Sequence, residues 1–170
     1  GLATGSLNAI ATSNVIEGSA IKQTFYGNAN DILSFDFKFL TDEDVLLEHN
    51  YPSRAYNDLA FFTFQFDDSP AYVFQLADTF SDFTNSYTPF IYETNAQTKS
   101  LSLLEAGYYT VGFGVVDVGD EGFSSSLLVD KVRLTPSPSE SVPDPSSLAG
   151  LAAFGFGAFM KHRKQQKAKA

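Results

Sequence analysis

The stretch Asp31–Thr41, DILSFDFKFLT, predicts the fold class of this chain more strongly than any other part of it. Apolar and polar residues alternate along it: Leu33, Phe35, Phe37 and Phe39 against Ser34, Asp36 and Lys38. Side chains alternate between the two faces of a β-strand, whereas a helix would spread these Phe residues around its circumference. We therefore expect a strand with one aromatic face in a core and one polar face toward water.

Comparable alternation recurs along the rest of the chain. We expect a strand at 19–27, a hairpin of Phe61–Phe66 with Ala71–Leu76, a strand pair about Thr94–Gln97, and strands over Tyr109–Val115 and Leu127–Leu134. One helical turn is expected at Asp44–Glu48. Clusters of Gly, Asn, Asp and Pro separate these stretches, as turns do, and the sequence between them has no long amphipathic pattern. The sequence therefore predicts an all-β protein, an antiparallel β-sandwich over residues 15–135.

Composition limits the classes of function. The 170 residues suffice for one well-buried domain, and the absence of Cys excludes disulfides, Cys-ligated zinc and thiol catalysis. The net charge is −9, and residues 1–140 hold six Lys or Arg against 19 Asp or Glu. An acidic body of this kind argues against a nucleic-acid partner.

The sequence offers little for catalysis. His49 beside Glu48 could act as a general base, but a solvated histidine in an acidic loop is the more common arrangement, and His162 lies in a basic tail. Asp67-Asp68 could suggest the carboxylate pair of a glycosidase, yet the Ser-Pro that follows is more typical of a turn. We therefore expect a protein that is not an enzyme.

Calcium is the cofactor that the loop composition favours, because hard cations bind several oxygen atoms and Asp, Glu and Asn supply them. Two clusters qualify: Asp42-Glu43-Asp44 with Asn57-Asp58, and Asp117 with Asp120 and Glu121. Neither has EF-hand spacing, and the alternative is that these carboxylates only solvate loops.

Exposed aromatic residues would serve sugar binding, because they stack on pyranose rings. Five tyrosines lie in or near predicted loops: Tyr51, Tyr56, Tyr72, Tyr87 and Tyr92. The chain has no Trp, and most of its Phe residues occupy core-facing strand positions. A carbohydrate-binding module is therefore an alternative function.

The two ends of the chain differ from its middle. Residues 1–14 are rich in Gly, Ser, Thr and Asn and predict a flexible arm that lacks the charged and apolar regions of a signal peptide. Residues 136–147 are rich in Pro and Ser and predict an extended linker. An apolar run follows at 148–160, and then a basic tail at 161–170.

The apolar run has 13 residues, Leu148–Met160. As a helix it would be about 20 Å long, short of the roughly 30 Å of a bilayer core, and its length alone would fit a buried helix. The run has no polar face, follows a linker and ends in Lys161, Arg163 and Lys164, which would stop transfer and snorkel at the inner membrane face. We therefore expect a short transmembrane helix.

This three-part end resembles the PEP-CTERM sorting signal of exported bacterial proteins. The matching motif is Pro143, Asp144, Pro145, Ser146 and Ser147, followed by the apolar run and the basic tail. The family usually has Glu between the prolines, so Asp144 keeps the carboxylate and loses one methylene. The resemblance covers about the last thirty residues.

The resemblance implies partners and a location. An exosortase-like processing enzyme would recognise Pro143–Pro145, while Leu148–Met160 anchors the chain in the inner membrane with its basic tail in the cytoplasm. After processing, the exported chain would reach the cell surface or the extracellular matrix, with a structural or adhesive role. Exopolysaccharide is the partner expected there, and a glycan-active enzyme is the least favoured alternative.

The body, residues 15–135, resembles jelly-roll passengers of the same sorting class and carbohydrate-binding modules, in SAIKQTF, LSFDFKFL and LLVDKVRL. Such folds pair an early strand with the last one. In those modules a structural calcium often joins an early Glu to an Asp of the last strand. The resemblance therefore implies Glu17 and Asp130 as further calcium ligands.

Overall fold

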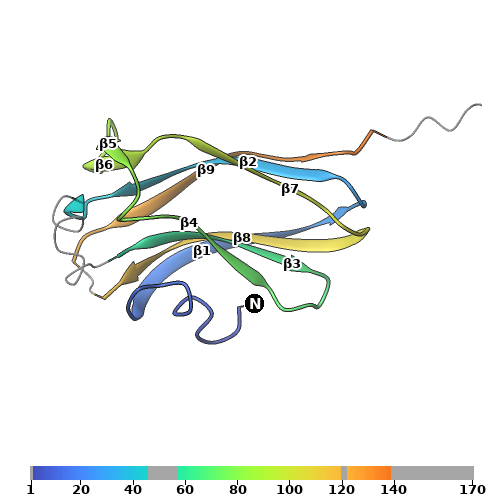
Figure 1. The fold of residues 1–170 in the computed structure, drawn as a ribbon, viewed down its shortest axis with the longest axis horizontal. Coiled ribbons are helices and arrows are strands. Elements are labelled where there is room, and N and C mark those ends of the chain that lie inside the picture. Colours follow the sequence, from blue (N-terminus) through green and yellow to red (C-terminus); the bar gives the residue numbers. More distant parts are fainter. Residues whose placement is uncertain (1, 46–56, 120–121, 139–170) are drawn as a thin grey trace, which may run out of the picture. The chain divides into compact units, whose positions relative to one another are not determined.

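The computed structural model describes residues 2–45, 57–119 and 122–138. In these residues nine strands form two antiparallel sheets that stack face to face (Figure 1). The strands are β1 (Val15–Gly27), β2 (Ile32–Thr41), β3 (Leu59–Phe66), β4 (Tyr72–Asp78), β5 (Phe83–Asn85), β6 (Tyr92–Thr94), β7 (Gln97–Ser102), β8 (Gly107–Val118) and β9 (Ser125–Thr135). The predicted all-β class and antiparallel sandwich are confirmed.

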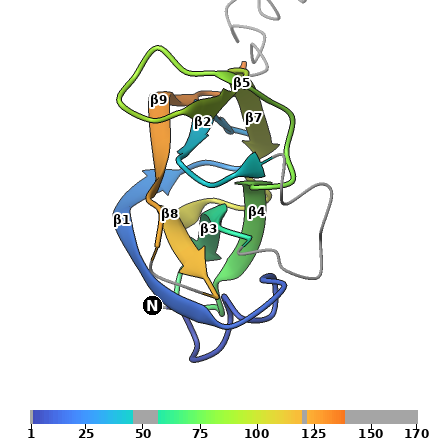
Figure 2. The ribbon, with the colours of Figure 1, turned by 90° about the vertical axis from the view of Figure 1, so that its left-hand side faces the viewer.

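The first sheet has the order β1-β8-β3-β4, and the second has the order β5-β6-β2-β7 with β9 on the other side of β2. Hence β1 and β9 lie at one flank of the sandwich, and β4 and β7 lie at the other (Figure 2). The early strand β2 pairs with the last strand, with Ile32 opposite Thr135 and Thr41 opposite Ser125.

The core forms around β2, as its alternation predicts. Its apolar residues Leu33, Phe35, Phe37 and Phe39 expose 2%, 1%, 6% and 0% of their surfaces. The ring of Phe35 lies 4.8 Å from that of Phe113 and 5.0 Å from that of Phe62, between centroids. Burying each such side chain stabilises the fold by about 1.5–3 kcal/mol, so these rings hold the two sheets together.

The predicted hairpin between β3 and β4 is also confirmed. Asp67 turns the chain with a φ of 43°, a left-handed conformation that Asp tolerates, and the Ser69 N–H donates to the Phe66 carbonyl. The carboxylate of Asp67 accepts a hydrogen bond from the Tyr108 N–H at 3.0 Å. Asp67 therefore has a structural part in this turn.

The strand pair expected around Thr94–Gln97 is wrong, because β6 and β7 do not pair with each other. Both pair with β2, one after the other, with Thr41 opposite Tyr92 and Phe37 opposite Gln97. The residues between them interrupt the ladder without reversing the chain. The alternation of apolar and polar residues predicts that a stretch forms a strand, but it does not predict which strand lies beside it.

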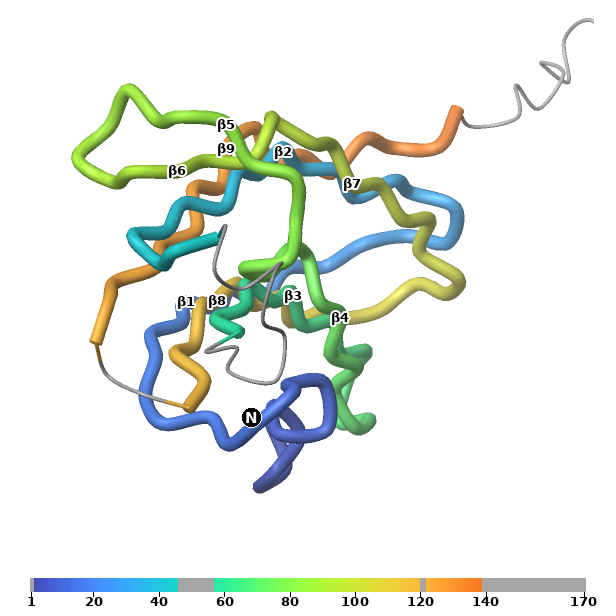
Figure 3. The backbone as a smooth tube through the Cα atoms, turned by 60° about the vertical axis from the view of Figure 1, so that its left-hand side comes forward, coloured from blue at the N-terminus to red at the C-terminus, as the bar shows by residue number. Residues whose placement is uncertain are grey.

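Residues 2–14, predicted as a flexible arm, form turns that pack on the outer face of the first sheet (Figures 1 and 3). Leu2, Leu7 and Ile10 of the arm contact the buried cluster that includes Phe61. A Cβ at Gly114 would lie 2.4 Å from the Phe61 ring, so glycine lets this ring approach the sheet. The arm therefore covers the part of the first sheet's outer face around Phe61.

Asp31 ties the end of the last strand to the turn between β1 and β2. Its carboxylate accepts hydrogen bonds from the Asn28 N–H at 2.8 Å and from the Ser137 N–H at 3.0 Å. These donors lower the pKa of Asp31 below its ordinary value, the Asn28 N–H more than the Ser137 N–H. The ionised carboxylate therefore stabilises the point where the chain leaves the sandwich.

No helix among the described residues is both long and apolar enough to cross a membrane. The expected helix at 148–160, the basic tail at 161–170 and most of the linker at 136–147 lie outside the described residues. The helical turn expected near Asp44 also falls mostly outside them.

Candidate binding cleft

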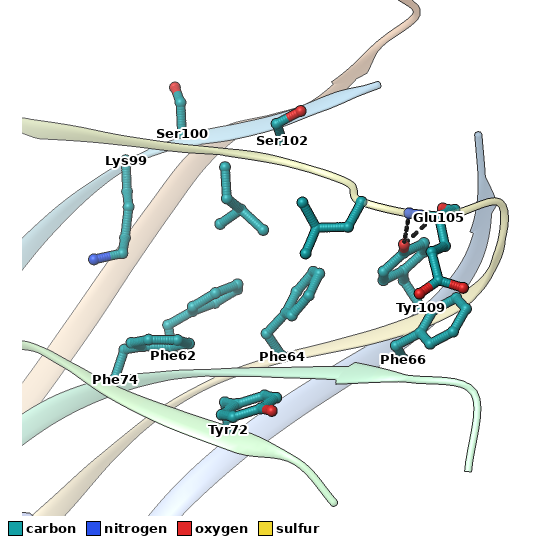
Figure 4. Close-up of a pocket in the computed structure, with 12 residues that line it drawn as sticks. Phe62, Phe64, Phe66, Tyr72, Phe74, Lys99, Ser100, Ser102, Glu105 and Tyr109 are labelled. Carbon is teal, nitrogen blue, oxygen red and sulfur yellow. Dashed lines mark hydrogen bonds between the residues drawn. The ribbon is translucent and has the colours of Figure 1, made fainter. Parts of the chain in front are cut away.

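A cleft of about 350 Å³ opens at the β4–β7 flank, between the facing edges of the two sheets (Figure 4). It is lined by Phe62, Phe64, Phe66, Tyr72, Phe74, Lys99, Ser100, Leu101, Ser102, Leu104, Glu105 and Tyr109. Its volume falls within the range of small-molecule sites, about 300–1,000 Å³.

Strand periodicity explains the aromatic wall of this cleft. Alternate residues of β3 point between the sheets, and Figure 4 shows Phe62, Phe64 and Phe66 in one row along the cleft. On the neighbouring edge strand β4, Tyr72 and Phe74 expose 66% and 41% of their surfaces. Apolar surface therefore continues from the core to solvent at this flank.

Tyr109 closes one end of the cleft. Its ring lies 5.2 Å from Phe64 and 5.0 Å from Phe66, and its hydroxyl donates to the Glu105 carbonyl at 2.7 Å. The Glu105 N–H donates in turn to the Tyr109 hydroxyl at 3.3 Å. These bonds fix the loop after β7 against β8 and place Glu105 at this end of the cleft.

Lys99 lies at the opposite end. It lies opposite Phe35 in the pairing of β7 with β2, and its side chain points toward Phe74 (Figure 4). The amine lies 5.6 Å from the centre of the Phe74 ring, a cation–π contact. The ion pairs Lys38–Glu93 and Lys131–Asp36 involve other lysines, and no carboxylate among the described residues pairs with Lys99.

Polar groups are few inside the cleft. Ser100 and Ser102 of β7 point away from it in Figure 4. The charged groups of its lining are Lys99 at one end and Glu105 at the other. The cleft therefore suits an apolar body, with a single charged group next to Lys99.

The structure brings some of the residues predicted to bind calcium together. Glu17 of β1 lies directly opposite Asp117 of β8. With Ser124 and Ser125 they surround a polar hollow of about 320 Å³ at the other flank of the sandwich. Among the described residues no group of three or more His, Cys, Asp or Glu is placed to hold a metal ion.

Asp58 is linked to this hollow by Ser125, which lines the hollow and hydrogen-bonds to the Asp58 carboxylate. The Asp58 carboxylate is fully buried and accepts hydrogen bonds from the Val118 N–H at 3.0 Å and from the Ser125 hydroxyl at 2.6 Å. Val118 belongs to the first sheet and Ser125 to the second. The structure thus gives Asp58 a part in joining the two sheets.

Asp130 is not brought to Glu17. It lies in the second sheet opposite Asp36, where it lines a separate hollow with Asp36 and Lys131. The Lys131 amine lies 2.6 Å from the Asp36 carboxylate, and this hydrogen bond lowers the pKa of Asp36 and raises that of Lys131. The pairing of Glu17 with Asp130 that the resemblance implies therefore has no counterpart in the described geometry.

In the first predicted calcium cluster, Glu43 and Asn57 are buried, and the carboxylate of Asp42 accepts a hydrogen bond from the Ile91 N–H at 2.8 Å. The predicted tyrosines are divided between the cleft, the surface and the undescribed segments. Tyr72 lines the cleft, Tyr87 is fully exposed, and Tyr92 is half-buried in β6. These predicted residues lie outside the described part of the chain: Asp120, Glu121, Glu48, His49, His162, Tyr51, Tyr56, the motif Pro143, Asp144, Pro145, Ser146 and Ser147, and the charges Lys161, Arg163 and Lys164.

The sequence pattern does not predict the cleft, because it places the Phe residues of β3 in the core. The sequence signal lies in β7 and the residue after it, where Lys99, Leu101 and Leu103 alternate with Ser100 and Ser102. A lysine on the apolar row of a short strand indicates an uncovered edge of a sheet.

Compared with known proteins, the chain matches no family model and no curated protein sequence.

Proposed function

We propose that this chain is an exported, non-catalytic protein of the cell surface or extracellular matrix with a structural or adhesive role. In this proposal the C-terminus is a PEP-CTERM-like sorting signal, which an exosortase-like enzyme processes at the inner membrane. The body is a jelly-roll-like passenger that makes contacts outside the cell. The sequence order of Pro-rich motif, apolar run and basic tail supports the sorting part.

The observation that carries the binding role is the apolar cleft at the β4–β7 flank. Its wall continues outward to Tyr72 and Phe74, so a bound molecule would cover apolar surface that now contacts water. Binding of this kind requires no catalytic side chains, and it is consistent with a passenger domain that has an adhesive role.

The first test is the intact mass of the protein recovered from its native cells, with separation of membrane and medium. We expect a mature chain that ends near Pro143–Ser147 and is found outside the cell. Replacing Pro143 and Pro145 with Ala should leave the chain unprocessed and bound to membrane. An intact, soluble and cytoplasmic wild-type chain would overturn the sorting proposal.

Glycan binding is the second candidate, and the exposed ring of Tyr72 beside Phe74 favours it. Exopolysaccharide would then stack on these rings, with calcium near Glu17 and Asp117 as a structural ion. Affinity electrophoresis through polysaccharide gels tests this proposal. Tyr72→Ala should abolish retardation, whereas Tyr87→Ala, at a fully exposed tyrosine away from the cleft, should not.

A further inference from the structure

We propose that the cleft at the β4–β7 flank binds a straight-chain alkyl carboxylate, with the carboxylate at Lys99 and the alkyl chain over the aromatic wall. This inference rests on the proposed binding role of the sandwich and names the chemical class of the ligand. It follows from the shape of the cleft, from the position of its one cation and from the position of its one carboxylate.

The apolar wall is elongated, because Phe62, Phe64 and Phe66 form one row along the cleft, and this suits an alkyl chain. It follows β7 and the loop after it from Lys99 to Leu104, a span of roughly 16 Å at the rise of an extended strand. An extended alkyl chain advances by less than one C–C bond of about 1.5 Å per carbon, so this span accommodates at least ten carbons. Phe62, Phe64 and Tyr109 line the opposite side and would bury the chain.

Lys99 supplies charge for the head group. Lys99 is half-buried as a residue, its amine lies 5.6 Å from the centre of the Phe74 ring, and no carboxylate among the described residues pairs with it. A ligand carboxylate would form a charge-assisted hydrogen bond to this amine at the edge of the apolar wall. An uncharged alkyl alcohol would lack this bond.

Glu105 determines the orientation of the ligand. It lies at the far end of the cleft, where the Tyr109 hydroxyl contacts its backbone. Its carboxylate would repel a ligand carboxylate placed there and would not oppose an alkyl terminus. The two ends of the cleft therefore differ in charge as the two ends of a fatty acid do.

An alternative explanation for Lys99 is that an inward-facing charge on the edge strand β7 prevents this strand from pairing with a strand of another chain. That reading predicts no effect of the ammonium on the affinity for an alkyl carboxylate. Ligand binding by Lys99 variants separates the two readings.

The experiment is isothermal titration of the purified full-length chain with decanoate, decan-1-ol and decyltrimethylammonium. We expect decanoate to bind most tightly. The net charge of −9 favours non-specific binding of the cationic amphiphile, whereas the basic tail at 161–170 attracts the anion, so the Lys99 variants are needed to assign a preference for the anion to the cleft. Equal binding of the three, or no binding of decanoate, would overturn the proposal.

Variants assign the interaction to the cleft. Lys99→Met should weaken decanoate binding by about tenfold while leaving the alcohol unchanged, and Lys99→Arg should restore most of the affinity. Tyr72→Ser should weaken both ligands, since it removes an exposed part of the wall. Lys22→Met, at an exposed lysine of β1, is the matched control and should change neither. Loss of affinity in Lys22→Met equal to that in Lys99→Met would overturn the proposal.

Failure of this inference is distinguishable from failure of the proposed function. A processed chain outside the cell that does not bind decanoate would refute the ligand and keep the sorted passenger. A chain that binds decanoate through Lys99 but remains in the cytoplasm would keep the ligand site and refute the sorting.

Discussion

Replacing Asp58 with Ala removes a buried carboxylate that joins the two sheets of the sandwich. One oxygen accepts a hydrogen bond from the Val118 N–H at 3.0 Å, and the other accepts one from the Ser125 hydroxyl at 2.6 Å. Asp58 and Val118 are both fully buried, so water does not replace the lost acceptor. We therefore expect a large loss of stability.

The magnitude follows from these two bonds. Leaving the Val118 N–H buried without an acceptor costs about 1–3 kcal/mol, and losing the hydrogen bond from Ser125 to a charged acceptor costs about 1.5–3 kcal/mol. Asp58→Ala should therefore lower the free energy of unfolding by about 2.5–6 kcal/mol, a large part of the 5–15 kcal/mol typical of a domain. Asp58→Asn should cost about 1 kcal/mol, because its carbonyl still accepts from Val118 and its amide can donate to Ser125.

Urea unfolding followed by far-ultraviolet circular dichroism measures both variants. Asp68→Ala, which removes an exposed carboxylate from the β3–β4 turn, is the control and should change stability by less than about 0.5 kcal/mol. Equal unfolding midpoints for Asp58→Ala and Asp68→Ala would refute the reasoning. Destabilisation that occurs only in the presence of calcium would assign Asp58 to a metal site.

Three further predictions concern acid stability, packing and calcium. Because the pKa of Asp31 is lowered, its ionised carboxylate stabilises the fold above the ordinary pKa of 3.8, and this stabilisation is lost as the pH falls through the lowered pKa. Asp31→Asn should therefore be less stable than the wild type at pH 7 and should lose less stability than the wild type between pH 5 and pH 2. Identical acid-unfolding curves for the two proteins would contradict this prediction. Gly114→Ala should destabilise by about 1–3 kcal/mol in urea unfolding, because its Cβ would overlap the Phe61 ring, whereas Ser19→Ala at an exposed position should be neutral. If calcium binds near Glu17 and Asp117, calcium at one hundred times its Kd should stabilise the fold by about 2.7 kcal/mol and raise the melting temperature. The double variant Glu17→Gln, Asp117→Asn should show no such rise, and an equal rise in both proteins would place the ion elsewhere.

Much of the fold is determined locally by the sequence. The alternation in Asp31–Thr41 predicts which residues of β2 are buried, because side-chain direction in a strand has a period of two. The turn at Asp67 is likewise local, since it needs only residues that tolerate its backbone angles. The PEP-CTERM resemblance is a sequence pattern too, and it lies outside the described residues.

Only the tertiary structure decides which strands are neighbours and which edges stay open. Periodicity does not distinguish β6 and β7 as a hairpin from their successive pairing with β2, and it does not show that the arm covers Phe61. The cleft has the same origin: Phe64 has the pattern of a core residue, yet it borders an opening because β4 and β7 are edge strands of different sheets. Burial depends on the partner layer, and residues far apart in the chain, such as Phe64 and Lys99, face the same opening only once both sheets have assembled.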